Sequence, residues 1–267
     1  MLRLLGRLPA AAGLCGRVLR IMGLAMHATV STTEPAALPF VYPQAQAPSR
    51  GIPEACREWC LGLRHAQIPF HSDDRLLLFY GHPLVFRLGL YAAGDRVLAG
   101  EPVVYLDGAH TFDQLFIGRM ARAHRRQPRT LLTMIHVARA FTCHQLERLV
   151  SDCLMSALER YQSRIAILSG LFDTFYDEAV PEHEAIRLFG RMMEASHRLA
   201  QQGSTVLFLC PQAPMLTRAS RRCLDQLRTQ ADRVIRVQEE QGIVKLHDEG
   251  ETSGHHREIP RTALEMS

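Results

Sequence analysis

The sequence has almost no lysine. Lys245 is the only one, so arginine supplies nearly all of the 31 cationic side chains in a chain of 267 residues. No other position can therefore offer an amine to bind a phosphate, to form a Schiff base or to act as a general base. The net charge of +4 permits contact with nucleic acid or with anionic surfaces but does not require it.

Several catalytic and metal-binding patterns are also missing. The chain has no Gly-x-Ser-x-Gly elbow, no His-Glu-x-x-His helix and no Gly-x-Gly-x-x-Gly fingerprint. Its seven cysteines lack the paired spacing of a disulfide framework or a zinc ribbon, which favours a reducing compartment. Cys56 and Cys60 would share one face of a helix that we expect over residues 54–66, and we expect plain thiols there and no metal site.

Residues 1–33 contain no acidic side chain, and their arginines and leucines would give a helix one basic and one apolar side. Three interpretations stay open: a mitochondrial targeting peptide, a membrane-surface or partner-binding helix, or upstream sequence before a true start at Met22 or Met26 instead of Met1. The apolar runs are too short for a transmembrane segment. We expect a poorly packed segment and a cytoplasmic protein, or a mitochondrial or membrane-surface one if the segment is functional.

The length suits one large α/β domain with tails. We expect residues 1–53 to combine the basic segment with a linker rich in proline and alanine. Residues 54–248 are expected to form the domain, and residues 249–267 a polar tail.

Apolar runs of strand length alternate with helical patterns through the domain. Strands are expected at 76–80, 103–106, 131–137, 164–168 and 205–210, and helices at 54–66, 82–99, 113–124, 143–161 and 181–201. Thr142 is a natural N-cap for one helix, with Gln145 completing a capping box. Residues 233–237 and 243–247 predict a terminal hairpin. This order predicts a largely parallel sheet with helices on both faces and an antiparallel C-terminal hairpin.

Five segments stand in an order that is found in a known family. They are AGEPVVYLDGAHTFD, VARAFTCHQLERLV, RIAILSGLFDTFYDE, TVLFLC and ADRVIRVQEEQGIVKLHDE. From Arg75 to His247 the chain thereby resembles the ATPase core of the RecA/RadA recombinase superfamily and its KaiC-like relatives. The resemblance implies a three-layer, RecA-like P-loop NTPase fold for about two thirds of the chain.

The resemblance also locates a phosphate-binding loop, and this loop is degenerate. Such a loop needs glycines for close backbone approach, a lysine for the outer phosphates and a hydroxyl for magnesium. The corresponding residues begin with Gly81 but continue to Phe86 in place of the second glycine, Arg87 in place of the lysine and Leu88 in place of the hydroxyl. Pro83 removes one amide donor. We therefore expect no nucleotide binding in the usual mode.

Two further positions implied by the resemblance are changed. After Asp107, the place of the water-activating glutamate falls on Ala109, which cannot accept a proton. The acid that supports magnesium is replaced by Ser169. His110 is a conceivable substitute base, and Asp173 a conceivable cation ligand, but we expect both to face solvent.

These replacements predict a non-hydrolysing, RecA-like protein that binds DNA or a recombination or repair protein, with no cofactor. Homo- or hetero-oligomers through the interface of the family are a further possibility. The arginines we expect to contact DNA are Arg119, Arg122, Arg218, Arg221 and Arg222, with the segment 211–222 foremost. Arg125, Arg126, Arg129 and Arg228 stand beside them in the sequence and could contribute further phosphate contacts. Two alternatives stay open: a divergent ATPase that holds ATP and magnesium with the help of Arg87, and a regulatory scaffold that binds only protein.

Overall fold

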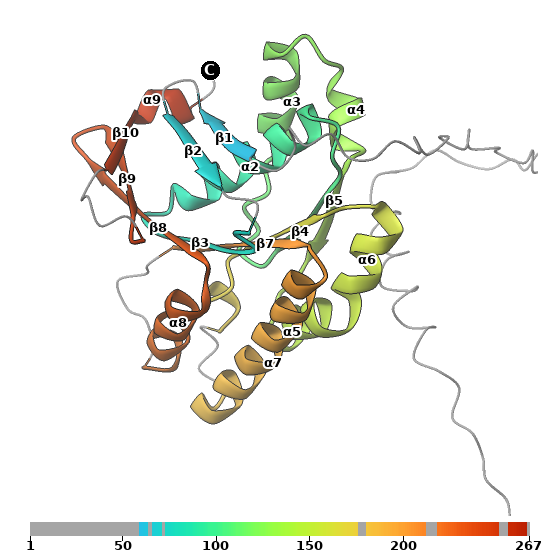
Figure 1. The fold of residues 1–267 in the computed structure, drawn as a ribbon, viewed down its shortest axis with the longest axis vertical. Coiled ribbons are helices and arrows are strands. Elements are labelled where there is room, and N and C mark those ends of the chain that lie inside the picture. The colour runs from blue at the N-terminus through green and yellow to red at the C-terminus, as the bar shows by residue number, and fades with distance from the viewer. Residues whose placement is uncertain are drawn as a thin grey trace, which may run out of the picture. The chain divides into compact units, whose positions relative to one another are not determined.

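An eight-stranded, mostly parallel sheet forms the centre of the structure, which is a computed structural model (Figure 1). The strand order is β10-β9-β8-β3-β7-β6-β4-β5. The strands are β3 (Leu76–Gly81), β4 (Val103–Asp107), β5 (Ile135–Arg139), β6 (Ile165–Ser169), β7 (Thr205–Pro211), β8 (Arg233–Glu240), β9 (Ile243–Asp248) and β10 (His256–Pro260). Pairs from β8 to β5 are parallel, whereas β8, β9 and β10 pair antiparallel. The predicted α/β class and C-terminal hairpin are confirmed.

The structure describes residues 59–63, 66–70, 73–175, 180–211, 218–250 and 256–265. All of them belong to the unit that spans Glu58–Ser267. For residues 59–63 and 66–70 the description covers the backbone alone. The expected targeting segment, the linker and Cys56 lie outside the described residues. Within the described ranges, no helix has the length and apolar character needed to cross a membrane.

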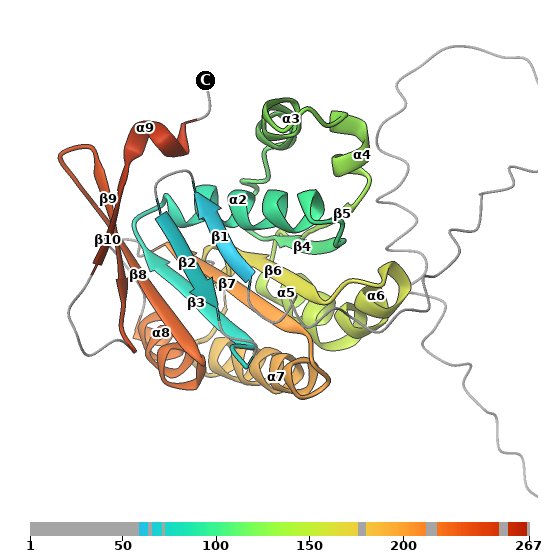
Figure 2. The same ribbon diagram turned by 45° about the horizontal axis from the view of Figure 1, so that its top comes forward.

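Helices cover both faces of the sheet, as Figures 1 and 2 show. On one face lie α2 (Val85–Leu98), α3 (Gln114–Ala123) and α4 (Pro128–Leu132). On the other lie α5 (Cys143–Arg148), the π-helical turn η2 (Leu149–Cys153), α6 (Leu154–Tyr161), α7 (Glu182–Gln201) and α8 (Arg218–Gln230). The short elements η3 (Asp173–Phe175) and α9 (Arg261–Leu264) complete the described part.

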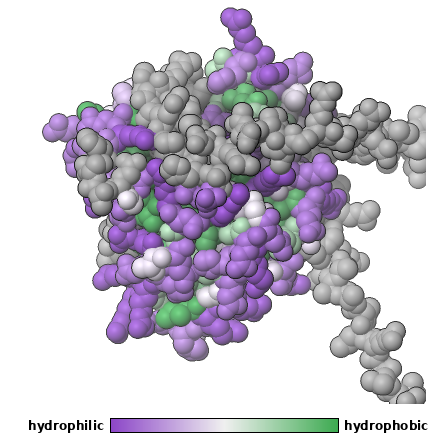
Figure 3. Space-filling view, viewed as in Figure 1, coloured by the Kyte–Doolittle hydropathy of each residue, from purple (hydrophilic) through white to green (hydrophobic). Residues whose placement is uncertain are grey.

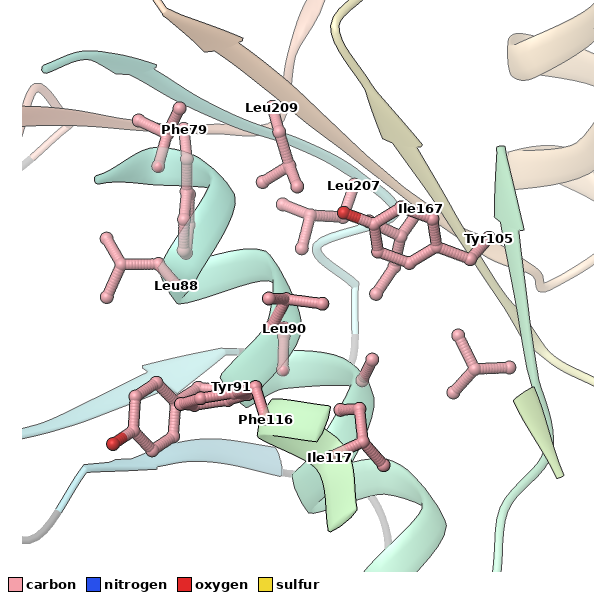
Figure 4. Packing of buried hydrophobic residues seen from close by; sticks show 14 of the residues in the cluster. Phe79, Leu88, Leu90, Tyr91, Tyr105, Phe116, Ile117, Ile167, Leu207 and Leu209 are labelled. Atoms are coloured by element: carbon pink, nitrogen blue, oxygen red, sulfur yellow. The ribbon is translucent and has the colours of Figure 1, made fainter. Parts of the chain in front are cut away.

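The main core lies between the sheet and α2 (Figure 4). Every residue of β3 and β4 is buried, as expected for strands covered on both faces. Leu88 from α2 is fully buried in the same cluster as Phe79 and Leu209 from the sheet. Tyr91 contacts Phe116 edge to face, with ring centroids 4.9 Å apart, and so ties α2 to α3.

The prediction of a helix over residues 54–66 is wrong at residues 59–63 and 66, the part of this range that the structure describes. The chain forms strands β1 (Trp59–Leu63) and β2 (Ala66–Phe70), which pair antiparallel. Gly62 and Pro69 both disfavour a helix interior, and apolar residues alternate along the two strands. Cys60 therefore lies in a strand and not in a helix. It cannot share a helix face with Cys56, as the sequence had suggested.

Two other boundaries differ from the prediction. The run 131–137 was expected as one strand, but Leu131 ends up in α4, which starts with Pro128 in its first turn, and the strand begins only at Ile135. The expected polar tail beyond Asp248 includes β10 and α9, whose Ile259 and Leu264 are fully buried. Two well-spaced apolar residues were sufficient to bring this segment into the core.

Helix α8 was not predicted as a helix. Its sequence is strongly polar. Ala219, Cys223 and Leu227 mark a buried stripe at a spacing of four residues, with Leu224 buried beside it. The predicted N-cap of α5 is confirmed, because the Gln145 amide donates to Thr142 Oγ1 at 3.2 Å. The Gln145 side chain does not complete the capping box as predicted, because it accepts from the amide of Phe141 and not from that of Thr142.

Candidate functional site

The candidate site lies at the edge of the sheet where the parallel strands end. β3, β4 and β6 finish at Gly81, Asp107 and Ser169, three of the residues singled out from the sequence. β3 and β7 are neighbours in the sheet, but α2, which follows β3, lies on one face and α8, which follows β7, lies on the other (Figure 2). In open α/β sheets, ligands bind outside the carboxyl ends of the strands at such a point.

The turn after β3 is closed by its own hydrogen bonds. The amide of His82 donates to the carbonyl of Val237 at 2.8 Å, and the amide of Leu84 to His82 Nδ1 at 3.3 Å. The amides of Val85 and Phe86 donate to the carbonyls of residues 82 and 83 at 3.0 and 3.1 Å. Residue 83 is proline and has no amide proton. Within residues 82–86, all of which the structure describes, no amide is left to bind a phosphate.

Gly81 explains why the turn sits against β8. Its φ is +115°, and a Cβ at this position would lie 2.3 Å from the carbonyl oxygen of Val237. Glycine is therefore required by the close approach of this backbone to β8, whether or not a phosphate binds. The glycine that the resemblance assigns to phosphate binding serves the packing of β3 against β8.

Arg87 is directed at α3. Its guanidinium lies 4.6 Å from the centre of the Phe116 ring, and its Nη1 is 3.5 Å from Asp113 Oδ2. Asp113 is also the N-cap of α3, because its carboxylate accepts hydrogen bonds from the amides of Leu115 and Phe116. The arginine at the place of the phosphate-binding lysine thus fastens α2 to α3.

The Asp107 carboxylate is buried and satisfied within the protein. It accepts from the amides of Thr111 at 2.9 Å and Phe112 at 3.2 Å, and Arg139 Nε lies 3.4 Å from it. Asp107 therefore fixes the loop that follows β4. Ala109 in this loop packs on Gly170, where an added Cβ would lie 2.3 Å from the Ala109 Cβ.

Ser169 is buried beside two other hydroxyl groups. Its Oγ lies 3.1 Å from Thr111 Oγ1, and the hydroxyl of Tyr105 is buried nearby. Burial raises the pKa of Tyr105 above its ordinary value, so this group stays protonated at neutral pH. Ser169 cannot supply the charge that a magnesium ion needs. In the described part of the chain, no group of three His, Cys, Asp or Glu side chains could hold a metal ion.

The five arginines selected from the sequence do not form one surface. Arg119 and Arg122 lie on α3, whereas Arg218, Arg221 and Arg222 lie on α8, on the other face of the sheet (Figure 1). Arg222 is 3.6 Å from Glu182 and Arg119 is 3.8 Å from Asp113. Residues 212–217 of the segment expected to contact DNA lie outside the described residues.

A second basic surface contains four members of the arginine group 119–129, which the sequence suggested as a source of phosphate contacts. The junction of α3 and α4 exposes four arginines, and none of the four has an ion pair with a described residue: Arg122, Arg125, Arg126 and Arg129. We call this set the α3–α4 basic surface. The sequence signal is the absence of any Asp or Glu from residue 114 to residue 146, a stretch that contains six arginines and three histidines.

Arg125 in this surface adopts a conformation usually reserved for glycine. Its φ is +55°. The amide of Arg126 donates to Ala121 at 2.8 Å and that of Arg125 to Arg122 at 2.9 Å, the two hydrogen bonds of a Schellman helix end. Glycine would adopt this conformation without strain, whereas for any other residue it costs a conformational free energy of about 1 kcal/mol. An arginine therefore occupies a position at which the backbone conformation favours glycine.

No model of a known protein family matches the chain, and no curated protein matches it significantly. A function for the chain has to be argued from the geometry above.

Proposed function

We propose that this protein has a RecA-like fold that does not turn over ATP, and that it binds DNA through the α3–α4 basic surface. The observation that carries the proposal is the acid-free stretch from residue 114 to residue 146, which presents four exposed arginines without ion pairs to described residues. Unpaired arginines gain most from contact with phosphates, because no internal ion pair has to be broken.

The RecA-like part of the proposal is supported by where the segments of the resemblance lie. Gly81, Asp107 and Ser169 come from three separate segments, and each ends a parallel strand at the same edge of the sheet. A family whose site is built at that edge would require this placement. The C-terminal hairpin also follows the last parallel strand, as the resemblance implies.

The loss of ATP turnover is supported by the closed turn and by Arg87. Phosphate binding would require the turn to release hydrogen bonds at His82, Leu84, Val85 and Phe86, and Arg87 to leave Asp113. Calorimetric titration with ATP and magnesium is expected to give no binding heat. A saturable heat would instead support the divergent ATPase.

DNA binding is tested by charge reversal at matched sites. We would compare Arg126→Glu/Arg129→Glu in the α3–α4 basic surface with Arg218→Glu/Arg221→Glu on α8. Fluorescence anisotropy with labelled single-stranded and double-stranded DNA, at several salt concentrations, measures the affinity. The first variant is expected to lose at least about tenfold in affinity for both DNAs and to show a shallower salt dependence. The α8 variant is expected to lose less.

The control is Arg164→Glu/Arg198→Glu, two exposed arginines outside both basic surfaces. All three double variants take the formal net charge from +4 to 0. An equal loss in the control and in the α3–α4 variant would mean that only net charge matters, and the proposed surface would be abandoned.

A protein partner is the second candidate, favoured by one observation. Leu115 at the start of α3 is 68% exposed although it is large and apolar. On the face seen in Figure 3, however, the coloured residues are mainly hydrophilic and the hydrophobic patches are small and separate. Such a face is less suited to a protein interface than to a charged ligand. Capture of a single protein, unaffected by nuclease and lost in Leu115→Ser, would favour this candidate.

A further inference from the structure

The most exposed large hydrophobic side chain in the described part of the chain is Phe141. It follows β5, and 71% of its surface is open to solvent. Its ring lies against that of His110, which follows β4, with ring centroids 4.5 Å apart and 32° between the ring planes. Because β4 and β5 are neighbours in the sheet, the two rings meet at its carboxyl edge.

The backbone holds Phe141 in this exposed place. Its amide donates to Gln145 Oε1 at 2.8 Å, while the Gln145 amide donates to Thr142 Oγ1 at 3.2 Å. These two hydrogen bonds fix the start of α5 and the position of Phe141 before it. The exposure of the phenyl ring is therefore set by the fold and is not a property of a loose loop.

His110 is held just as firmly. Its φ of +56° lies in the left-handed region, which residues other than glycine seldom adopt. The Asp107 carboxylate accepts from the amides of Thr111 and Phe112 and so fixes the loop around it. Strained backbone of this kind clusters at functional sites. His110 occupies a position where glycine would fit without strain, and its ring is stacked on Phe141.

The chain that leads from α3 to Phe141 is basic. Phe141 lies within the acid-free stretch 114–146. Arg139, two residues before it, has a half-exposed side chain 3.4 Å from Asp107, and the latter carboxylate is fully buried. An exposed aromatic pair beside the half-exposed side chain of Arg139 complements a ligand that is both aromatic and anionic.

We propose that His110 and Phe141 form a platform on which an unpaired base of single-stranded nucleic acid stacks. This inference rests on the proposed function and adds to it the kind of strand and the point of base contact. Aromatic side chains stack on any base, but bases within a duplex are already stacked on one another. The platform therefore makes the protein prefer single strands, whereas the α3–α4 basic surface binds phosphates of either form.

The test compares Phe141→Ala, Phe141→Leu and Phe141→Trp in the full chain. The probes are a labelled oligothymidine strand and a labelled duplex of mixed sequence, both at fixed salt. Phe141→Ala and Phe141→Leu are expected to weaken oligothymidine binding about tenfold, with duplex binding and the salt slope unchanged. Phe141→Trp is expected to bind oligothymidine at least as tightly as the wild type, because indole offers a larger stacking face.

His110→Gly separates stacking from folding. Glycine relieves the left-handed strain, so the thermal midpoint is expected not to fall, while oligothymidine affinity is expected to fall severalfold. Unchanged affinity in both His110→Gly and Phe141→Leu would overturn the platform and leave the proposed DNA binding intact. Failure of the wild type to bind either probe would overturn both.

One other occupant has a distinct outcome. If Phe141→Ala leaves oligothymidine affinity unchanged but converts an oligomer into monomers in analytical ultracentrifugation, the ring pair is a contact between copies of this chain. That result would also overturn the stacking proposal.

Discussion

Replacing Leu88 by serine introduces the hydroxyl that a phosphate-binding loop would carry at this position, and we expect the substitution to destabilise the protein. Leu88 is fully buried in the cluster shown in Figure 4. Burial of a leucine side chain contributes about 1.5–3 kcal/mol, and the cavity left behind raises the loss to about 2–5 kcal/mol.

The new hydroxyl can be satisfied locally, which limits the loss. The Leu88 amide donates to the Leu84 carbonyl at 3.0 Å, so a serine side chain on α2 can bond to the carbonyl one turn earlier. No unpaired buried hydroxyl then has to be added to the cavity term. We expect the free energy of unfolding to fall by about 3–4 kcal/mol, a large part of the roughly 5–15 kcal/mol that stabilises a typical domain.

The assay is urea unfolding followed by far-ultraviolet circular dichroism. Leu88→Ser should lower the midpoint with little change in slope. Leu115→Ser is the matched control, since the same side chain is lost from a position that is 68% exposed, and its effect should stay within about 0.5 kcal/mol. Equal effects of the two substitutions would refute the argument that position 88 belongs to the core.

Two further predictions concern the turn and the pH dependence of stability. Gly81→Ala should lower the free energy of unfolding by more than about 2 kcal/mol, because Gly81 has a positive φ and its added Cβ would meet the Val237 carbonyl. Gly100→Ala is the control in the same urea assay. Gly100 also has a positive φ but faces open space, so the free energy of unfolding should fall by only about 1 kcal/mol. Burial, helped by the charge of Arg160, lowers the pKa of His136 below its ordinary 6.5. The folded state then binds fewer protons than the unfolded state, so stability is complete above about pH 6.5 and is lost as the pH falls through the lowered pKa. His136→Phe, which keeps a stacked ring, should reduce the loss measured between pH 7.5 and 5.5; an identical loss would contradict the assignment.

The strands could be predicted because each buried strand is a continuous run of apolar residues in the sequence. β3, β6 and β7 are uniformly buried except for the end of β7, and each is bounded by a turn. Where only a few apolar residues decide the structure, prediction failed. Ile259 and Leu264 fix β10 and α9, and the stripe of α8 holds few apolar residues among many charged ones.

The sequence could predict which residue types occupy the candidate site, but not which of them contact one another. The replacement of loop residues at Phe86 and Arg87 is visible in the sequence, but the hydrogen bond from His82 to Val237 joins segments more than a hundred residues apart. The contact of His110 with Phe141 likewise depends on β4 and β5 being neighbours. Contacts of this kind follow from strand order, which local spacing does not determine.

The last described residues have a consequence for the timing of folding. The hydroxyl of Tyr91 on α2 donates to the carbonyl of Ala263 at 2.8 Å, and Leu264 is fully buried in the same core. Synthesis runs from the N-terminus to the C-terminus, so residues 263 and 264 leave the ribosome long after α2. Until then the apolar face of α2 lacks part of its cover, and the nascent protein has to pass through a state that a chaperone can recognise.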